Sequence, residues 1–400
     1  MIYLDWAASA PPDPEALDEA RNVSLQLFGN PSSPHAAGRE ARERLEQERG
    51  RLARCIGADP REIVFTSGGT ESNCSLLLSL LDRHRLGGVE RQKARIIITG
   101  IEHSSVYEQA HALQGHGIAC AVVPPRPNGT VDPQAVADAL DADTVMVSVM
   151  FVNNETGAIQ QVAEIARAVR EFSAQRGRKI LFHTDAVQAF AKIPFDVQKL
   201  GVDAASISAH KVGGPRGIGA LFLRAGAATA FLPTGGGQEV GRRPGTENLA
   251  GICAMRVAAE KRIGSMEASL AAARENMRRL VTGLRGIPGG WIIPASRGSG
   301  DDAAFSPYIL MAGFPPLPAE VVVRIADGRG YCISSGSACS TVKKDRTRVA
   351  ESMGLSPETA RAAIRISIGP GTEPGHIDGL LSMFREELPP LLAISRGRRT

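Results

Sequence analysis

The sequence is poor in aromatic residues, lacks closely paired cysteines and contains no long apolar run. Aromatic side chains make up 4% of the 400 residues and the net charge is +4, which is unlike a nucleic-acid-binding surface. The six cysteines include no C-x-x-C pair, so neither a disulfide framework nor a zinc knuckle is indicated. No apolar stretch approaches the roughly 20 residues of a membrane helix, and the N-terminus does not resemble a secretory signal. We therefore expect a cytoplasmic protein with free thiols and with neither a nucleic-acid nor a membrane partner.

The length and composition are those of a folded protein with more than one domain. Apolar residues make up 43% and charged residues 22% of the chain, close to the globular average. Because 400 residues exceed what one core usually serves, we expect a large domain over residues 15–255. A smaller α+β domain would combine residues 1–14 with residues 256–400, and the glycine- and proline-rich stretch at 285–302 is typical of a boundary region.

Short apolar segments alternate with helical patterns through the first two thirds of the chain. Residues 162–175 carry apolar side chains at the spacing of an amphipathic helix, and a long helical pattern runs from about Asn248 to Leu284. This alternation predicts an α/β fold with a mostly parallel sheet covered by helices. The expected strands are 62–66, 95–99, 144–150, 179–184 and 204–208.

Polar residues follow each expected strand directly. In doubly wound sheets, ligands bind outside the carboxyl ends of the strands, so these residues should meet at one edge. After the strand at 62–66, the segment "SGGTESN" places two glycines at the start of a helix, and the backbone N–H groups there suit a phosphate. The spacing of these glycines matches neither a Walker lysine motif nor G-x-G-x-x-G. In chain order the residues are Gly69 and Thr70, His103, Asn154, Asp185 with Gln188, and His210 with Lys211.

Lysine is scarce in this chain, which makes Lys211 unusual. Only eight of the 46 basic residues are lysines, and a lysine, unlike an arginine, can attack a carbonyl through its amine. Pyridoxal phosphate would use an anion site, an amine for its aldehyde and a carboxylate for its pyridine nitrogen. Ordinary structural interpretations also exist: Lys211 as a solvated turn cation, Asp185 as a helix cap, Asn154 as a turn residue and His103 as a helix-starting residue.

Short motifs that span nearly the whole chain extend this interpretation. They are "YLDWAASA", "GNPSSPH", "TSGGTES", "EH" at 102–103, "NNETG", "DAVQ", "SAHKVGGPRGIGAL", "GGGQE", "RRPGTEN" and "SSGSACS". In these motifs the chain resembles the cysteine desulfurases of the NifS/IscS type, in the class V branch of fold-type I pyridoxal phosphate enzymes. The resemblance implies the fold-type I architecture, a homodimer and pyridoxal 5'-phosphate as the cofactor.

The resemblance also assigns roles in cofactor binding. Lys211 would hold the aldehyde as a Schiff base, His103 would stack on the ring and move protons, and Asp185 would face the pyridine nitrogen. The phenolic oxygen would be held by Gln188 and Asn154. The phosphate would be bound by Gly69, Thr70, Ser208 and His210, and by Thr246 from the partner subunit.

A further set of implied roles concerns the substrate, L-cysteine. Arg365 would bind its carboxylate, a task that suits a guanidinium, with Asn30 assisting. Cys339, in "SSGSACST", would be the nucleophile that accepts the sulfur as a persulfide, whereas Cys332 in "GYCIS" is expected to be packed. The products would be L-alanine and an enzyme-bound persulfide for iron–sulfur cluster or thiolation pathways.

Two features leave alternatives open. The basic run "KKDRTR" at 343–348 departs from the family pattern just after Cys339, which leaves the sulfur-acceptor protein unidentified. A selenocysteine lyase or another class V enzyme would share the cofactor residues, and a non-enzymatic sulfur-transfer scaffold is a further alternative. The joint presence of Lys211, Asp185, Cys339 and Arg365 favours the desulfurase.

Overall fold

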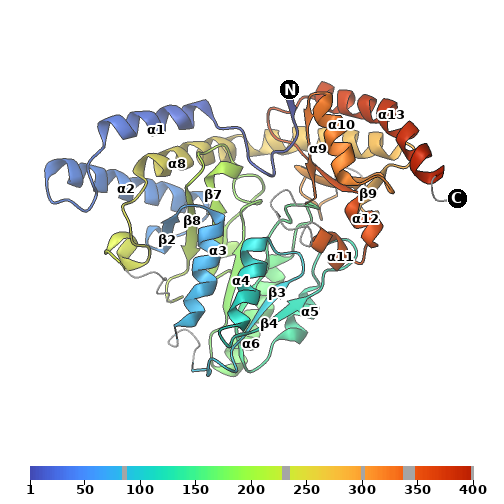
Figure 1. Ribbon diagram of the computed structural model, residues 1–400. Helices are drawn as coiled ribbons and strands as arrows, with labels where there is room; N and C mark the ends of the chain where they lie inside the picture. Colours follow the sequence, from blue (N-terminus) through green and yellow to red (C-terminus); the bar gives the residue numbers. More distant parts are fainter. Residues whose placement is uncertain (83–87, 228–234, 299–301, 337–346, 398–400) are drawn as a thin grey trace.

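The protein is built around a seven-stranded sheet (Figure 1). The structure is a computed structural model that describes residues 1–82, 88–227, 235–298, 302–336 and 347–397. Strand β8 runs antiparallel to both of its neighbours, and all the other pairings in the sheet are parallel. The predicted mostly parallel sheet is therefore confirmed. In spatial order the strands are β2 (Ile63–Thr66), β8 (Gly219–Leu223), β7 (Ala204–Ser208), β6 (Leu181–Asp185), β5 (Thr144–Ser148), β3 (Arg95–Thr99) and β4 (Ala119–Val123).

Helices cover both faces of this sheet because successive strand residues point to opposite sides. In β3, Ile96 and Ile98 belong to the core beneath α3 (Gly69–Leu78) and α4 (Ser104–Gln114). Ile97, between them, belongs to the core beneath α6 (Val162–Arg176). Burial on both faces explains why the strands read as continuous apolar runs rather than as alternating patterns.

Two strands of the large sheet and one break in a helical stretch were not predicted from the sequence. Strand β4 lies at the edge of the sheet and is partly exposed, and β8 directly follows the glycine-rich motif after Lys211. The helical stretch predicted from Asn248 to Leu284 is two helices, α8 (Leu249–Gly264) and α9 (Met266–Arg285), separated by Ser265. The predicted helical stretch is therefore confirmed apart from a local turn at Ser265, which interrupts an apolar pattern that continues on both sides.

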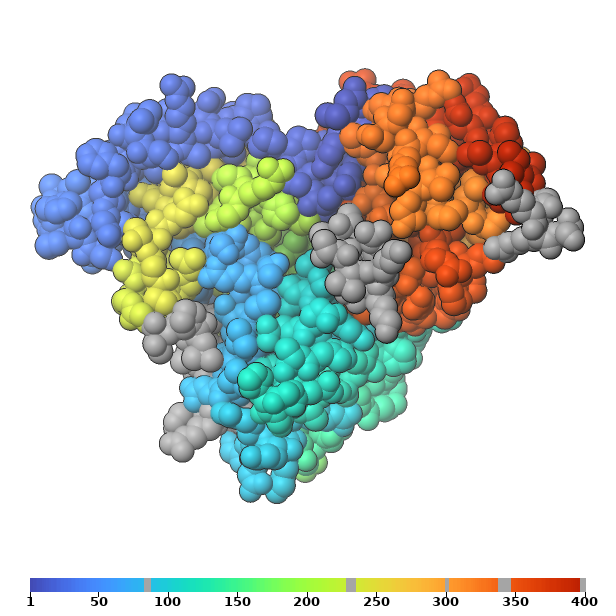
Figure 2. All heavy atoms as spheres, in the orientation of Figure 1, coloured from blue at the N-terminus to red at the C-terminus, as the bar shows by residue number. Residues whose placement is uncertain are grey.

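A second sheet is formed by the C-terminal part of the chain. Its strands lie in the order β12 (Ser334–Ser335), β13 (Ala363–Ser367), β10 (Ile309–Gly313) and β9 (Trp291–Ile293), and all are antiparallel. The N-terminal strand β1 (Ile2–Tyr3) pairs with β11 (Tyr331–Cys332). Figures 1 and 2 accordingly place the dark blue N-terminal residues beside the orange and red elements. The division into domains stays a prediction, and its boundary at residues 255 and 256 falls inside α8.

The remaining helices complete the two regions. They are α1 (Pro14–Gln26), α2 (Ala36–Cys55), α5 (Pro133–Ala139), α7 (Val197–Leu200), α10 (Ala319–Gly328), α11 (Arg348–Ser352), α12 (Pro357–Arg361) and α13 (Pro374–Gly397). Among the described helices, none combines the length and the apolar character needed to cross a bilayer.

Helices α1, α2 and α8 are held together by a buried ion-pair network. Glu48, which is 1% exposed, lies 2.8 Å from Arg44 and 2.6 Å from Arg256. Glu19 pairs with the same two arginines. Glu19, Glu48 and Cys253 are close enough to share a metal ion, but two guanidinium groups already neutralise the carboxylates, so the cluster is a structural one.

Candidate active site

A cavity of about 340 Å³ lies where the parallel strands of the large sheet end. Its wall includes Ala7 and Ala8 from the N-terminal segment and residues that follow β2, β3, β5, β6 and β7. The structure thus brings together most of the residues singled out in the sequence. Those in the wall are Gly69, Thr70, His103, Asn154, Asp185, Gln188, Ser208, His210, Lys211 and Arg365.

Three predicted residues are not placed in this cavity. Asn30 and Thr246 are exposed and are not among the residues of this chain that line it. Cys339 lies outside the described residues. Cys332 is half-buried on β11, opposite Tyr3 of β1. The roles given to Asn30, Thr246 and Cys339 therefore stay predictions.

The glycines around Lys211 let the chain turn sharply at the end of β7. Lys211 ends a 3₁₀ turn over Ala209–Lys211, and its Nζ donates to the carbonyls of Ala7 at 2.8 Å and Ala8 at 2.7 Å. A Cβ on Gly214 would lie 2.8 Å from the Cβ of Ala209, closer than such atoms pack. The glycine-rich turn therefore folds back on itself and leaves the amine directed at the N-terminal segment beside the cavity.

The start of α3 forms a cradle for an anion. Helix α3 begins at Gly69 without a side-chain cap, after Gly68 with a φ of +152°, a conformation that favours glycine. The first N–H groups of a helix and its dipole attract negative charge. The buried Oγ of Ser208 has no hydrogen-bond partner among the described residues, and a Cβ added to Gly68 would lie 3.7 Å from it. The cradle thus offers backbone and hydroxyl groups to a phosphate.

His210 adds a neutral ring to the same cavity. Burial, with the positive charge of Lys211 nearby, lowers the pKa of His210 to about 4. Its Nδ1 lies 3.3 Å from Ser9 Oγ. At neutral pH the ring is therefore uncharged, and it acts on an anion as a hydrogen-bonding group rather than as a cation.

Asp185 is connected to His103 through two residues that the sequence analysis missed. Asp185, 4% exposed, accepts the backbone N–H of Val187 at 3.0 Å and the Nδ2 of Asn73 at 2.7 Å. Asn73 also donates to Ser105 Oγ at 2.9 Å, and that hydroxyl lies 2.8 Å from His103 Nδ1. Asn73 is four residues after Gly69 and so lies on the same helix face, which is the signal that could have identified it.

His103 is the N-cap residue of α4 and is half-buried at the cavity. Its Nδ1 accepts the backbone N–H of Ser105 at 3.1 Å, so the ring proton is assigned to Nε2. Burial lowers the pKa of His103, and Lys211 acts in the same direction, whereas Asp185 opposes them. The ring is therefore neutral at neutral pH and carries one N–H.

Arg365 lies on β13 and already has protein partners. It is 2% exposed, its Nη2 lies 2.8 Å from Asp5 Oδ1, and its Nη1 donates to Asn154 O at 3.1 Å. Its buried Nε has no hydrogen-bond partner among the described residues. The guanidinium thus connects the N-terminal segment and the loop after β5 to β13. A substrate carboxylate would therefore bind a guanidinium that already contacts Asp5 and Asn154.

Glu102 is a fully buried carboxyl group next to His103. Its Oε1 accepts hydrogen bonds from Thr99 Oγ1 at 2.6 Å and from Met150 N at 2.9 Å. Burial nevertheless raises the pKa of Glu102 to about 8. The carboxyl group is therefore protonated at neutral pH and connects the end of β3 to the end of β5 as a neutral group.

This raised pKa predicts a pH-dependent stability that Glu102→Gln removes. Between pH about 5 and 8 the folded chain keeps a proton that the unfolded chain has lost, so its stability falls as pH rises. A glutamine, neutral throughout, should eliminate about 3 to 5 kcal/mol of that fall. Urea unfolding at pH 5 and pH 8 measures the difference, with the exposed Glu108→Gln as the control. An unchanged pH dependence in Glu102→Gln would contradict the burial argument.

Comparison with known proteins agrees with this geometry. The family described as aminotransferase class-V matches residues 2–380. The chain belongs to the aminotransferase class-V family. Strands and helices on both sides of the cavity fall within the matched residues, so the family covers both the large sheet and the C-terminal sheet.

Relatives in this class V family include cysteine desulfurases. Cysteine desulfurase IscS from Dictyoglomus turgidum is 34% identical over 98% of this chain and 96% of that protein. A mitochondrial cysteine desulfurase from Arthroderma benhamiae is 35% identical over 98% of this chain and 76% of that protein. A solved NifS-like protein matches with a TM-score of 0.87 and 33% identity, covering 97% of this chain and 99% of that structure. The predicted fold and the predicted family resemblance are confirmed.

Proposed function

We propose that this protein is a pyridoxal phosphate-dependent cysteine desulfurase. It converts L-cysteine and the thiol of Cys339 into L-alanine and a Cys339 persulfide. The observation that carries the proposal is the convergence on one cavity of an amine, a carboxylate and an anion cradle, from Lys211, Asp185 and the start of α3. The cysteine desulfurases among the class V relatives support the same reaction.

The residues around the cavity fit pyridoxal phosphate. The unpartnered hydroxyl of Ser208 and the uncapped start of α3 suit its phosphate, and Asp185 can face its pyridine nitrogen. Lys211 supplies the amine for its aldehyde, and Gln188 and Asn154 line the same wall. When bound, the cofactor supplies an electron sink that stabilises negative charge at the α-carbon of the substrate.

The protein residues position the substrate and move its protons. The amine of Lys211 removes the α-proton of the bound cysteine, while the Asn73 hydrogen bond holds the Asp185 carboxylate in a fixed orientation. His103 is neutral and carries its proton on Nε2, so its imidazole can donate or accept a proton beside the cofactor ring. Cys339 then bonds to the substrate sulfur as the C–S bond breaks, and the carbon skeleton is released as alanine after protonation.

Arg365→Lys is expected to raise the KM for L-cysteine about 10- to 100-fold, with a smaller change in kcat. Lysine keeps the positive charge but loses the planar fork that binds a carboxylate through two N–H groups, and charge-assisted hydrogen bonds contribute about 1.5 to 3 kcal/mol each. Steady-state kinetics on L-cysteine measures the change. Arg361→Lys, exposed and outside the cavity wall, is the matched control. A KM that changes equally in both variants would contradict the role of Arg365.

The proposed function is tested by fixing the cofactor to the chain. Borohydride reduction followed by peptide mapping should attach pyridoxal phosphate to the peptide that contains Lys211, and L-cysteine should then be converted to alanine only by unreduced protein. Selenocysteine, assayed in parallel, separates the desulfurase from a selenocysteine lyase. Attachment at another lysine, or the absence of alanine, would overturn the proposal.

The quaternary structure, sulfur acceptor and location belong to the same proposal. We propose a homodimer in which Thr246 of one subunit completes the phosphate site of the other, and a small sulfur-acceptor protein as the recipient of the persulfide. Thr246 is exposed in the single chain, which is compatible with a contact across subunits. The cytoplasmic location and the division into two domains stay predictions.

A further inference from the structure

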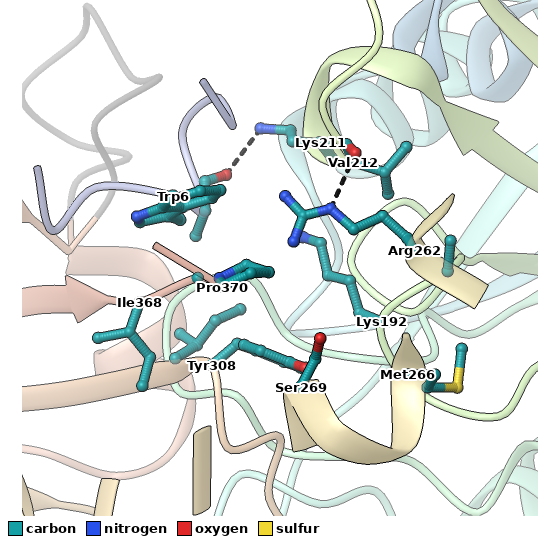
Figure 3. Close-up of a pocket in the computed structure, with 14 residues that line it drawn as sticks. Trp6, Lys192, Lys211, Val212, Arg262, Met266, Ser269, Tyr308, Ile368 and Pro370 are labelled. Carbon is teal, nitrogen blue, oxygen red and sulfur yellow. Dashed lines mark hydrogen bonds between the residues drawn. The ribbon is translucent and has the colours of Figure 1, made fainter. Parts of the chain in front are cut away.

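A second, smaller cavity of about 30 Å³ lies against the first. The two cavities share Ala7 and Lys211 in their walls. Figure 3 shows Lys192 and Arg262 below Lys211 in this view, across from Trp6. Among the described residues that line this cavity, none carries a carboxylate. Lys192 therefore has no ion-pair partner among these lining residues.

Lys192 instead contacts a residue of the main cavity. Its Nζ donates to the Oε1 of Gln188 at 2.6 Å, and Gln188 lines the cavity that would hold the cofactor. The backbone between them is unusual, because Ala191 has a φ of +52°. A residue with a Cβ rarely adopts this left-handed conformation, and such positions are concentrated at functional sites.

The two ends of the Gln188 amide are fixed by different partners. Its Nε2 donates to the carbonyl of Ala7 at 2.9 Å, and a carbonyl can only accept, so the NH₂ group must be the end on that side. The Oε1 end is then held by Lys192. Ala7 O also accepts from Lys211 Nζ, so a continuous hydrogen-bonded path runs from Lys192 through Gln188 and Ala7 to Lys211.

We propose that Lys192 is a positioning residue that holds the Gln188 side chain with its NH₂ group toward the cofactor cavity. Gln188 thereby acts as a hydrogen-bond donor to the phenolic oxygen of pyridoxal phosphate, and the left-handed turn at Ala191 places Lys192 to do this. This inference rests on the proposed function, because it assigns a role toward the proposed cofactor.

Charge at Lys192 is not required for this role. Burial, with the positive charges of Lys211 and Arg262 nearby, lowers the pKa of Lys192 well below its ordinary value. An uncharged amine still has N–H groups to donate. The contact with Gln188 Oε1 therefore persists in either protonation state, and hydrogen bonding rather than charge defines the role.

The test is the absorption spectrum of the lysine-bound cofactor as a function of pH. A donor on the phenolic oxygen stabilises the form that has lost its proton, so Lys192→Met should raise the pH of that loss by about 0.5 to 1 unit. The cofactor should also dissociate several-fold faster. Lys192→Arg, which keeps a donor, should lie close to the wild-type protein, and the exposed Lys199→Met is the matched control.

A double variant separates positioning from a direct charge effect on Lys211. In a Gln188→Ala background, Lys192→Met should cause no further shift, because the residue through which it acts is gone. A full additional shift in that background, or a wild-type spectrum in Lys192→Met, overturns the inference alone. Should Lys192→Met not fold, Lys192→Leu, which also lacks a hydrogen-bond donor, makes the same comparison. A chain that binds no pyridoxal phosphate at Lys211 overturns both the proposed function and this inference.

Discussion

A Lys211→Ala variant is expected to form alanine from L-cysteine at least about a thousandfold more slowly than the wild-type protein, since proton transfer by a positioned side chain alone contributes about 10²- to 10⁴-fold. Lys211 has two tasks in the account, covalent attachment of the cofactor and removal of the α-proton. Its amine lies between the two cavities and is directed by two backbone carbonyls. Alanine quantified by amino-acid analysis, at saturating cofactor, measures the loss.

Two controls sharpen this prediction. The exposed Lys199→Ala should behave as wild type. Among the described residues, Lys192 is the other lysine that lines the cavities, so borohydride reduction of Lys211→Ala should fix no cofactor on the peptide that contains Lys192. Activity within tenfold of wild type would contradict the assignment of the amine to Lys211.

Cys339→Ser should lose sulfur transfer by at least about a thousandfold, the scale seen when a nucleophile is removed from a set of groups that act together. A serine hydroxyl cannot form a persulfide, whereas cofactor attachment depends on Lys211 and should remain. Sulfide release in the presence of a reductant, together with the cofactor absorbance, measures the two steps separately.

Cys332→Ser is the matched control because Cys332 is half-buried on β11, where it pairs with Tyr3. It should stay largely active. Full activity in Cys339→Ser on L-cysteine, or a persulfide trapped on Cys332, would show that the nucleophile is wrongly assigned. Turnover of selenocysteine but not of cysteine by Cys339→Ser would fit the ready departure of selenium.

Much of the fold could be predicted because burial on two faces leaves a strong pattern. The apolar runs at 95–99 and 204–208 coincide with β3 and β7, and the amphipathic pattern at 162–175 coincides with α6 to within one residue. Strand β4 escaped prediction because an edge strand is only partly buried. The break at Ser265 escaped because apolar periodicity does not record a single turn between two helices.

Some residues of the site could likewise be predicted from the sequence, and others could not. Residues that directly follow strands could be placed together, since parallel strands end at one edge of the sheet. The partners that orient them could not, because they come from remote parts of the chain. Asp5 meets Arg365 across the N-terminal and C-terminal segments, and Asn73 meets Asp185 from helix α3. Thr246 illustrates a different limit, because its proposed contact with the cofactor of a partner subunit would have no counterpart within a single chain.

Sulfur transfer from L-cysteine to Cys339 is tested most directly by a single turnover with sulfur-labelled L-cysteine. The cofactor-loaded protein, in excess over the substrate and without reductant, is quenched, and alanine and protein-bound label are both quantified after peptide mapping. One alanine is expected for each labelled sulfur, with the label on the peptide that contains Cys339 and released by a reducing agent. Pyruvate in place of alanine, or alanine without protein-bound sulfur, would contradict it.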